Sequence, residues 1–268
     1  MSTVSYPRIA RWGSVYVALW RAQSMWKWRR AIISYGLGNP VLYLTSIGLG
    51  LGSIVDGRQA GGIDGVSYLV FLAPSLLASA ALMGGIEETT WPTLEGFVWG
   101  KQFRAIFASP ITGRQIALGV VWVSVLRTVV TVILYWAVLL VFGAVDLRSA
   151  PALIALCTIA GVAFTAFMLA VTVRVKNDDA FMSLFYRFAL MPLFLFSGTF
   201  YPLDTLNLAV RWIGWVSPLW HATELGRWLS YGHSLPGVML ATHSGFLLAM
   251  LAGGLWWGVR GYERRLAS

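Results

Sequence analysis

The stretch SAPALIALCTIAGVAFTAFMLAVTV, residues 149–173, decides the fold, because no charged residue interrupts it. A helix rises about 1.5 Å per residue, so roughly 20 apolar residues cross the hydrocarbon core of a bilayer, which is about 30 Å thick. This stretch is long and apolar enough to do so. It therefore predicts a helix that spans a membrane.

Further segments have the same character. Of the 268 residues, 57% are hydrophobic and 12% are charged, whereas a soluble domain carries about 25% charged residues. We therefore expect an all-α polytopic membrane protein, not a soluble globule, a disordered chain or a nucleic-acid binder. Its six predicted transmembrane helices are 31–55, 66–86, 115–145, 149–173, 180–203 and 235–259.

The basic residues predict the orientation of these spans. Fifteen of the 20 Lys and Arg residues lie before the first span, in the loop 87–114, in the segment 174–187, or after the sixth span. Four lie at the opposite ends of the spans, and Arg127 lies inside one. Because positive residues remain on the cytoplasmic side, we expect a multi-pass protein of the plasma (inner) membrane with both termini in the cytoplasm.

Residues 5–30 precede the first span and lack the apolar core of a signal peptide. At 100° per residue, aromatic and aliphatic side chains gather on one face of this segment, and Arg and Ser gather on the other. Such a helix is typical of the interface between water and lipid. We expect an interfacial helix that contacts membrane lipids; a helix packed on a neighbouring subunit is the alternative.

The sequence offers little for catalysis. Its three histidines are too far apart for a helical metal site, and it has no G-x-S-x-G motif and no phosphate-binding loop. Its one cysteine, Cys157, lies inside an apolar run. We therefore expect no catalytic residues, no metal site and no cofactor bound by this chain.

The loop after the second span predicts a cytoplasmic helix over residues 93–109. Thr93 can cap this helix, Glu95 favours its first turn, and Pro110 ends it. Because apolar residues lie on two faces, one face can meet the bilayer end of the protein and the other a partner protein. A second interfacial helix is the alternative.

The region after the fifth span is too polar to cross a bilayer simply. Gly198 and Pro202 break the fifth apolar helix near its outer end, and Pro218 breaks the next short one. Broken helices at membrane depth occur where they are buried in protein or line a cavity. We expect an extracellular re-entrant hairpin over 204–230, with a helix lying on the outer surface as the alternative.

Together these segments resemble the type 2 ABC exporter (ABC-2) permeases, and most of all the branch with nodulation-factor and daunorubicin-type export permeases. The resemblance covers nearly the whole chain. Two positions depart from the pattern: Glu224 stands where relatives often have Asp, and Ser217 where they often have Leu. The residues that carry the resemblance are Glu88-Thr89 with Trp91; Ser197-Gly198 with Phe200, Pro202, Asp204 and Leu206; and Pro218-Leu219 with His221, Leu225 and Arg227.

This resemblance implies the permease subunit of an exporter, not an enzyme. Two permease copies, identical or paralogous, would each bind a separate ATPase subunit that carries ATP and Mg. An amphipathic, lipid-linked or hydrophobic substrate (a glycolipid, saccharide-lipid or drug) would move outward. A non-transporting assembly subunit and a channel are the alternatives. The implied site residues are Thr93, Leu94, Glu95, Phe97, Lys101, Arg104 and Phe107 for coupling to the ATPase, and Ser197, Gly198, Phe200, Pro202, Asp204, Pro218, His221, Glu224 and Arg227 for an external gate.

Charged residues near or inside the spans need partners. Arg127 lies deep in the third span, where it either lines the substrate path or pairs with a carbonyl or carboxylate of a neighbouring span. Glu87 and Glu88 follow the second span, where the helix dipole disfavours them. We expect their basic partner to be Lys101, Arg104 or Arg29, and a gating network of Glu87, Glu88 and Arg29; ordinary solvated carboxylates are the alternative.

Overall fold

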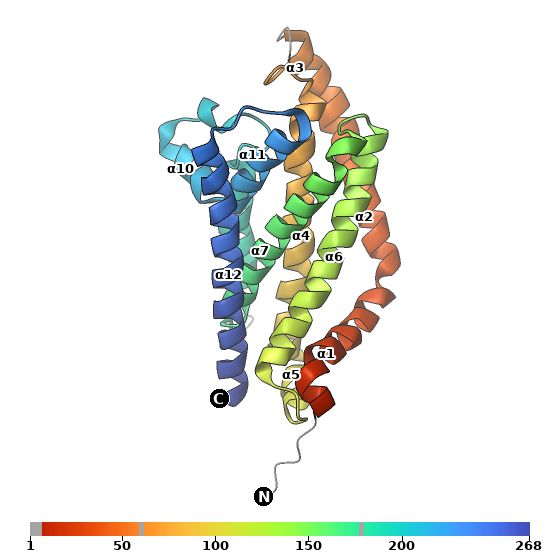
Figure 1. Cartoon of the computed structure of the whole chain (residues 1–268), viewed down its shortest axis with the longest axis vertical. Coiled ribbons are helices and arrows are strands. Elements are labelled where there is room, and N and C mark those ends of the chain that lie inside the picture. The colour runs from red at the N-terminus through yellow and green to blue at the C-terminus, as the bar shows by residue number, and fades with distance from the viewer. Residues whose placement is uncertain (1–6, 59–61, 177–179) are drawn as a thin grey trace, which may run out of the picture.

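The structure, a computed structural model, describes residues 7–58, 62–176 and 180–268 as a bundle of long helices (Figure 1). Within these ranges the only extended pairing is an isolated bridge between Ile63 and Val66. The helices are α1 (Pro7–Lys27), α2 (Arg29–Tyr43), α3 (Gly52–Arg58), α4 (Tyr68–Leu94), α5 (Gln102–Phe107), α6 (Gly113–Val141), α7 (Ala150–Thr172), α8 (Phe181–Phe185), α9 (Met191–Leu195), α10 (Leu208–Val216), α11 (Pro218–Tyr231) and α12 (Gly237–Ala267).

Wider π-helical turns join some of these helices into longer ones. Leu44–Leu51 connects α2 to α3, Glu95–Trp99 extends α4, and Tyr186–Leu190 connects α8 to α9. Among the described residues, five helices are long and apolar enough to cross a membrane. They are Arg29–Arg58, Tyr68–Trp99, Gly113–Val141, Leu147–Thr172 and Gly237–Ala267. The chain is therefore a multi-pass, all-α membrane protein, as the sequence predicts.

The predicted count of six spans is not reproduced. The segment predicted to span the membrane at 180–203 forms a shorter apolar helix, Phe181–Leu195. This helix ends early because Gly198 adopts a left-handed backbone, with φ of 69°, and turns the chain away. Residues 196–202 then form turns instead of a last helical turn.

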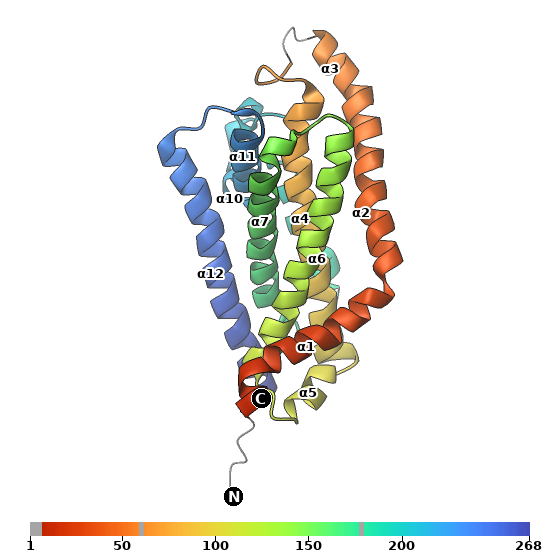
Figure 2. The ribbon, with the colours of Figure 1, turned by 45° about the vertical axis from the view of Figure 1, so that its right-hand side comes forward.

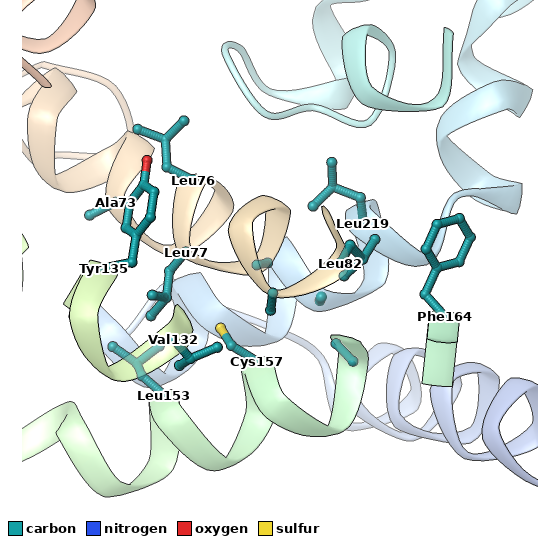
Figure 3. Close-up of a cluster of buried hydrophobic side chains, with 14 of the residues drawn as sticks. Ala73, Leu76, Leu77, Leu82, Val132, Tyr135, Leu153, Cys157, Phe164 and Leu219 are labelled. Carbon is teal, nitrogen blue, oxygen red and sulfur yellow. The ribbon is translucent and has the colours of Figure 1, made fainter. Parts of the chain in front are cut away.

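Helix α4 forms the centre of the bundle, where α6, α7 and α11 pack around it (Figure 1). Leu77, Val132, Leu153 and Cys157 point toward one another from α4, α6 and α7 in Figure 3, and all four are fully buried. A Cβ atom on Gly161 would lie 2.7 Å from the carbonyl oxygen of Ala81. Glycine at this position therefore lets α7 approach α4 closely, as small residues do between membrane helices.

The bundle has two distinct ends. One end holds α1, α5 and the C-terminus and is called the terminal end here; the other holds α3, α10 and the start of α12 and is called the hairpin end (Figures 1 and 2). Figure 2 shows α1 crossing α6 obliquely at the terminal end. The predicted helix at 5–30 is thus present as Pro7–Lys27. Its position at the membrane interface stays a prediction.

The predicted helix at 93–109 is not one helix. Helix α4 continues through Pro92 and, with its π-helical turn, reaches Trp99. The chain breaks at Gly100 and at Lys101, whose φ of 53° ends the helix, before α5 begins at Gln102. Thr93 lies inside a helix instead of capping one, because its fully buried side chain packs within the bundle and this packing outweighs the local capping signal.

Candidate functional site

A cavity of about 340 Å³ lies between α2, α4, α6 and the segment 186–194. We call it the central cavity. Its walls combine aromatic rings with neutral polar side chains. The polar side chains are those of Asn39, Ser79 and Thr131. Its four tyrosines come from three different parts of the chain: Tyr35, Tyr43, Tyr135 and Tyr186.

An ion pair borders the central cavity. Nη2 of Arg127 on α6 lies 3.1 Å from Oε2 of Glu87 on α4, and both residues line the cavity. The Arg127 side chain is 11% exposed, so α4 and α6 largely enclose it. The two hypotheses for Arg127 are therefore compatible in space: it pairs with a carboxylate of a neighbouring helix, and it also faces a cavity. Its role in a substrate path stays a prediction.

A second ion pair joins α1 to α4. Nη2 of Arg21 lies 3.0 Å from Oε1 of Glu88, and Nη1 lies 3.6 Å from Oε2 of Glu95. The side chains of Arg21 and Glu88 are only 8% and 12% exposed. Helix α1 is therefore tied to α4 by a largely buried pair of charges.

The predicted network of Glu87, Glu88 and Arg29 is wrong about its arginine. Arg29 donates a hydrogen bond of 3.2 Å to the carbonyl of Trp26, and it has no ion pair with either glutamate in the part of the chain that the structure describes. The reason is that α4 does not end before Glu87. Neighbouring residues inside a helix point about 100° apart. Glu87 therefore faces Arg127 of α6, whereas Glu88 faces Arg21 of α1.

At the hairpin end, Arg227 of α11 is almost fully buried, with 1% of its surface exposed. Its Nη2 donates to the carbonyl of Gly198 at 2.8 Å, and its Nη1 donates to Oε1 of Glu224 at 2.9 Å. Its guanidinium carbon lies 3.8 Å from the centre of the Phe71 ring on α4. Gly198, Glu224 and Arg227, which the resemblance assigns to one gate, are thus brought together.

Hydrogen bonds also fasten the turns after α9 to the rest of the bundle. The hydroxyls of Ser197 and Ser217 share a hydrogen bond of 2.6 Å. Ser75 and Tyr68 of α4 donate to the carbonyls of Thr199 and Phe200, each at 3.1 Å. The backbone of this segment is therefore held by side chains of α4.

The remaining predicted gate residues divide between two places. His221 and His243 share a hydrogen bond of 2.8 Å between their Nδ1 atoms, which joins α11 to α12. Pro202 precedes the short turn Leu203–Thr205. Asp204 pairs with Arg211 at 3.3 Å and is 93% exposed, so it lies at the surface and not in the Arg227 cluster.

The two helices of the predicted hairpin at 204–230 are α10 and α11, which meet at Ser217. A Cβ atom on Gly226 would lie 2.9 Å from Cβ of Pro74, near the start of α4. Leu219 lies beside Leu82, farther along α4, in Figure 3. Because α4 starts at the hairpin end, the tip formed by Ser217 and Pro218 lies deeper in the bundle than the end of α11. That α10 and α11 form a re-entrant hairpin open to the extracellular side stays a prediction.

The predicted coupling residues also divide into two groups. Lys101, Arg104 and Phe107 are exposed at the terminal end, on α5 or just before it. Thr93, Leu94 and Phe97 are buried, and Glu95 pairs with Arg21. The buried members hold α4, α5 and α12 together: Thr93 and Tyr262 share a hydrogen bond of 2.6 Å, and Phe97 packs edge-on against Phe103 and Tyr262.

Sequence reasoning missed several residues that shape these sites. For Arg21, a pattern in the sequence of α1 could have identified it as a buried residue. Gly13, Val17 and Arg21 recur at intervals of four, and all three are buried against the bundle. The cavity tyrosines and the contacts of Phe71 and Ser75 had no such signal, because they depend on which helices become neighbours. Within the described ranges, no three His, Cys, Asp or Glu side chains are grouped so as to hold a metal ion.

Known proteins are similar to this chain over the region that holds these sites. The sequence profile of a family described as "ABC-2 type transporter" matches residues 14–231, from α1 to the end of α11. Nodulation protein J of Sinorhizobium fredii (strain NBRC 101917 / NGR234) is 29% identical over 261 residues, which cover 94% of each chain. Nodulation protein J of Rhizobium leguminosarum bv. viciae is 28% identical over 239 residues, which cover 88% of each. The matched region includes both ion pairs, the central cavity and the hairpin.

Proposed function

Because the chain belongs to the ABC-2 type transporter family, we propose that it is the permease subunit of an ATP-driven exporter. It is a multi-pass membrane component of a transporter, not an enzyme. In this proposal it moves an amphipathic, lipid-linked or hydrophobic substrate outward across the plasma (inner) membrane. The observation that carries the proposal is the central cavity, which lies between the charged contacts of the terminal end and the hydrogen-bonded hairpin.

The lining of the central cavity suits an amphipathic substrate. Tyrosine offers an apolar ring together with a hydroxyl, so four tyrosines can contact both an apolar chain and polar groups. Arg127 and Glu87 add charge at one border of the cavity. Ionisable side chains inside a membrane domain are costly, and their presence there favours a functional role.

The terminal end is the cytoplasmic end in this proposal, because most Lys and Arg residues lie on that side of the spans. The exposed residues Lys101, Arg104 and Phe107 would contact a separate ATPase subunit, which binds ATP and Mg. Two ATPase copies and a second permease copy, identical or paralogous, complete the transporter. This chain has no phosphate-binding loop of its own.

Movement at the ATPase would reach the cavity through α4. Helix α5 packs through Phe103 against Phe97 and Tyr262, and α1 is tied to α4 through Arg21 and Glu88. Glu87, the residue directly before Glu88 on α4, borders the central cavity. A shift of α1 or α5 relative to the bundle therefore acts on the same helix that carries half of the cavity's ion pair.

The hairpin would close the path on the outer side. Its tip at Ser217 and Pro218 lies beside Ser79 and Leu82 of α4, and Ser79 also lines the central cavity. A re-entrant hairpin in this place forms the wall between the cavity and the exterior. Opening it requires α10 and α11 to move away from α4.

Purification from native membranes in mild detergent tests the proposal. We expect an ATPase with a phosphate-binding loop to co-purify with the permease in equal amounts and to hydrolyse ATP. The double variant Arg104→Glu with Phe107→Ala changes two exposed residues of α5 and should release the ATPase. The matched control Arg148→Glu changes an exposed arginine at the hairpin end and should retain it.

Two results would contradict the proposal. One is the reproducible absence of an ATPase from a folded, monodisperse permease, which favours an assembly subunit. The other is ion flux through the purified chain in liposomes without any ATPase, which identifies a channel.

A further inference from the structure

A second cavity, of about 790 Å³, opens at the terminal end beside the central cavity. We call it the vestibule. Met25 and Trp28 line it from the junction of α1 and α2, and Trp91 and Trp99 line it from the end of α4. The vestibule shares three lining residues with the central cavity: Ile32, Glu87 and Arg127. The two cavities are therefore neighbours, and the ion pair of Glu87 and Arg127 lies at their boundary.

Three aromatic rings connect the two cavities. The rings of Trp99 and Trp91 are nearly parallel, at 17°, with centres 6.3 Å apart. The rings of Trp91 and Tyr186 are also inclined by 17°, with centres 6.2 Å apart. Trp99 and Trp91 line the vestibule, whereas Tyr186 lines the central cavity. The series forms a ladder of parallel rings that leads from one cavity to the other.

The vestibule is acidic, although the terminal end as a whole is basic. Glu87, Glu88 and Glu95 line it, and Arg127 is the one basic residue among the described lining residues. Arg21, which does not line the vestibule, neutralises part of this negative charge through its ion pairs with Glu88 and Glu95. The side chains of Glu87 and Glu95 remain 44% and 46% exposed, so both carboxylates are accessible from the vestibule.

We propose that the vestibule is the loading site for an amphipathic organic cation that carries aromatic rings. Aromatic faces attract cations, and carboxylates in a partly enclosed cleft raise the local concentration of positive ligands. An anionic ligand of the same shape meets three carboxylates against the two arginines Arg127 and Arg21, and is disfavoured by this excess of negative charge. The direction of movement, along Trp99, Trp91 and Tyr186 toward the central cavity, rests on the proposed function; binding in the vestibule does not.

Binding of two matched ions to the purified full-length protein in lipid nanodiscs tests this assignment. Tetraphenylphosphonium and tetraphenylborate have nearly the same size and opposite charge. We expect radiolabelled tetraphenylphosphonium to bind saturably and about tenfold more tightly than tetraphenylborate. The cation is attracted by the carboxylates and the aromatic faces of the vestibule, whereas the anion is repelled by them, and this difference is worth at least that factor. Glu95→Gln and Trp99→Leu should each weaken cation binding about fivefold.

Both variants alter side chains that are nearly half exposed, so the fold should persist. The matched controls lie outside the vestibule: Asp146→Asn removes an exposed carboxylate at the hairpin end, and Trp256→Leu removes an exposed tryptophan of α12. Both controls should bind the cation like the unaltered protein. Equal affinity for the two ions overturns the assignment, and so does unchanged cation binding in Glu95→Gln and Trp99→Leu.

The outcome separates this inference from the proposed function. A permease that retains its ATPase but binds no tetraphenylphosphonium overturns the vestibule assignment alone. A permease that binds the cation through Glu95 and Trp99 but never associates with an ATPase supports the vestibule assignment and contradicts the exporter.

Discussion

The hairpin end and the terminal end hold buried arginines in different ways. Arg227 donates to the backbone carbonyl of Gly198 and to Glu224 of its own helix, and it lies against the Phe71 ring. Arg21 and Arg127 instead pair with carboxylates that belong to another helix, and these carboxylates border cavities. The Gly198 carbonyl is fixed in its backbone turn and Glu224 lies on the same helix as Arg227, whereas two side chains on separate helices can part when the helices move. We therefore expect the hairpin to move as a rigid unit, and the terminal end to change by exchanging side-chain partners.

The largest effect is expected for Arg227→Met. This change leaves the carbonyl of Gly198 and the carboxylate of Glu224 without their buried donor, which costs about 3–5 kcal/mol of unfolding free energy. The chain has one cysteine, Cys157, which is completely buried, so a thiol-reactive dye reports unfolding during a thermal scan.

Arg211→Met is the matched control for this change. Arg211 also lies at the hairpin end and donates to the carbonyl of Leu206, but its side chain is 25% exposed and its carboxylate partner is the highly exposed Asp204. Its loss should cost less than about 1 kcal/mol. Equal unfolding temperatures for the two variants would contradict the assigned difference between a fully buried and a partly exposed arginine.

A smaller effect is expected for Arg21→Met. It removes the partner of Glu88, whose side chain is only 12% exposed, and a hydrogen bond to a charged group is worth about 2 kcal/mol. The same thermal scan measures the loss. Arg29→Met is the control, because Arg29 is exposed and bonds only to a carbonyl of its own segment; it should change stability by less than about 0.5 kcal/mol. A larger loss of stability in Arg29→Met than in Arg21→Met would contradict the assignment of Arg21 as the partner of Glu88.

Tyr262→Phe should destabilise the terminal end by about 1 kcal/mol, because it removes the 2.6 Å hydrogen bond to Thr93 and leaves that buried hydroxyl unpaired. Tyr16→Phe, which changes an exposed tyrosine of α1, serves as the control and should have no measurable effect. A double variant with Thr93→Val should recover part of the loss, since no unpaired hydroxyl remains. Additive losses in the double variant would show that the two hydroxyls do not interact.

The smallest effect is expected for the pair of Arg127 and Glu87. Because Glu87 is 44% exposed, a double-mutant cycle with Arg127→Gln and Glu87→Gln should give a coupling free energy below about 1 kcal/mol. The same cycle for Arg21 and Glu88 should give a larger value. A coupling energy for Arg127 and Glu87 above that of Arg21 and Glu88 would mean that the cavity pair is a fixed structural contact and not an exchangeable one.

The sequence predicts the long helices well, because the hydrophobic length of a span is a local property. Residues 149–172 of the predicted span 149–173, for example, lie within the helix Leu147–Thr172. The segment 180–203 forms a shorter helix than predicted, since its hydropathy continues past the point where Gly198 turns the chain. Hydropathy describes whether the side chains of a segment prefer lipid or water, and it does not show where the backbone turns.

The candidate site is less predictable, because its contacts join distant parts of the chain. The resemblance groups Gly198 with Arg227, and the structure brings these two together, whereas the contacts of this region with Phe71 and Ser75 depend on packing. The role of the group as a gate stays a prediction. The partner of Glu88 is Arg21 and not Arg29, because the sequence does not show which face of α1 packs against α4. The sequence around Thr93 has the local signal of a helix cap, and this signal does not show that Tyr262, far along the chain, shares a hydrogen bond with Thr93.

Cysteine cross-linking at α5 tests most directly whether the terminal end receives an ATPase. In a Cys157→Ala background, Phe107→Cys places a thiol on the exposed side of α5, and Val141→Cys places one at the hairpin end, where Val141 is 85% exposed. With a short bifunctional maleimide, we expect Phe107→Cys to form a covalent adduct with the co-purified ATPase, identified by mass spectrometry, and Val141→Cys to form none. An ATPase-containing complex in which Phe107→Cys gives no adduct, or in which both positions react equally, would contradict the assignment of α5 as the contact with the ATPase.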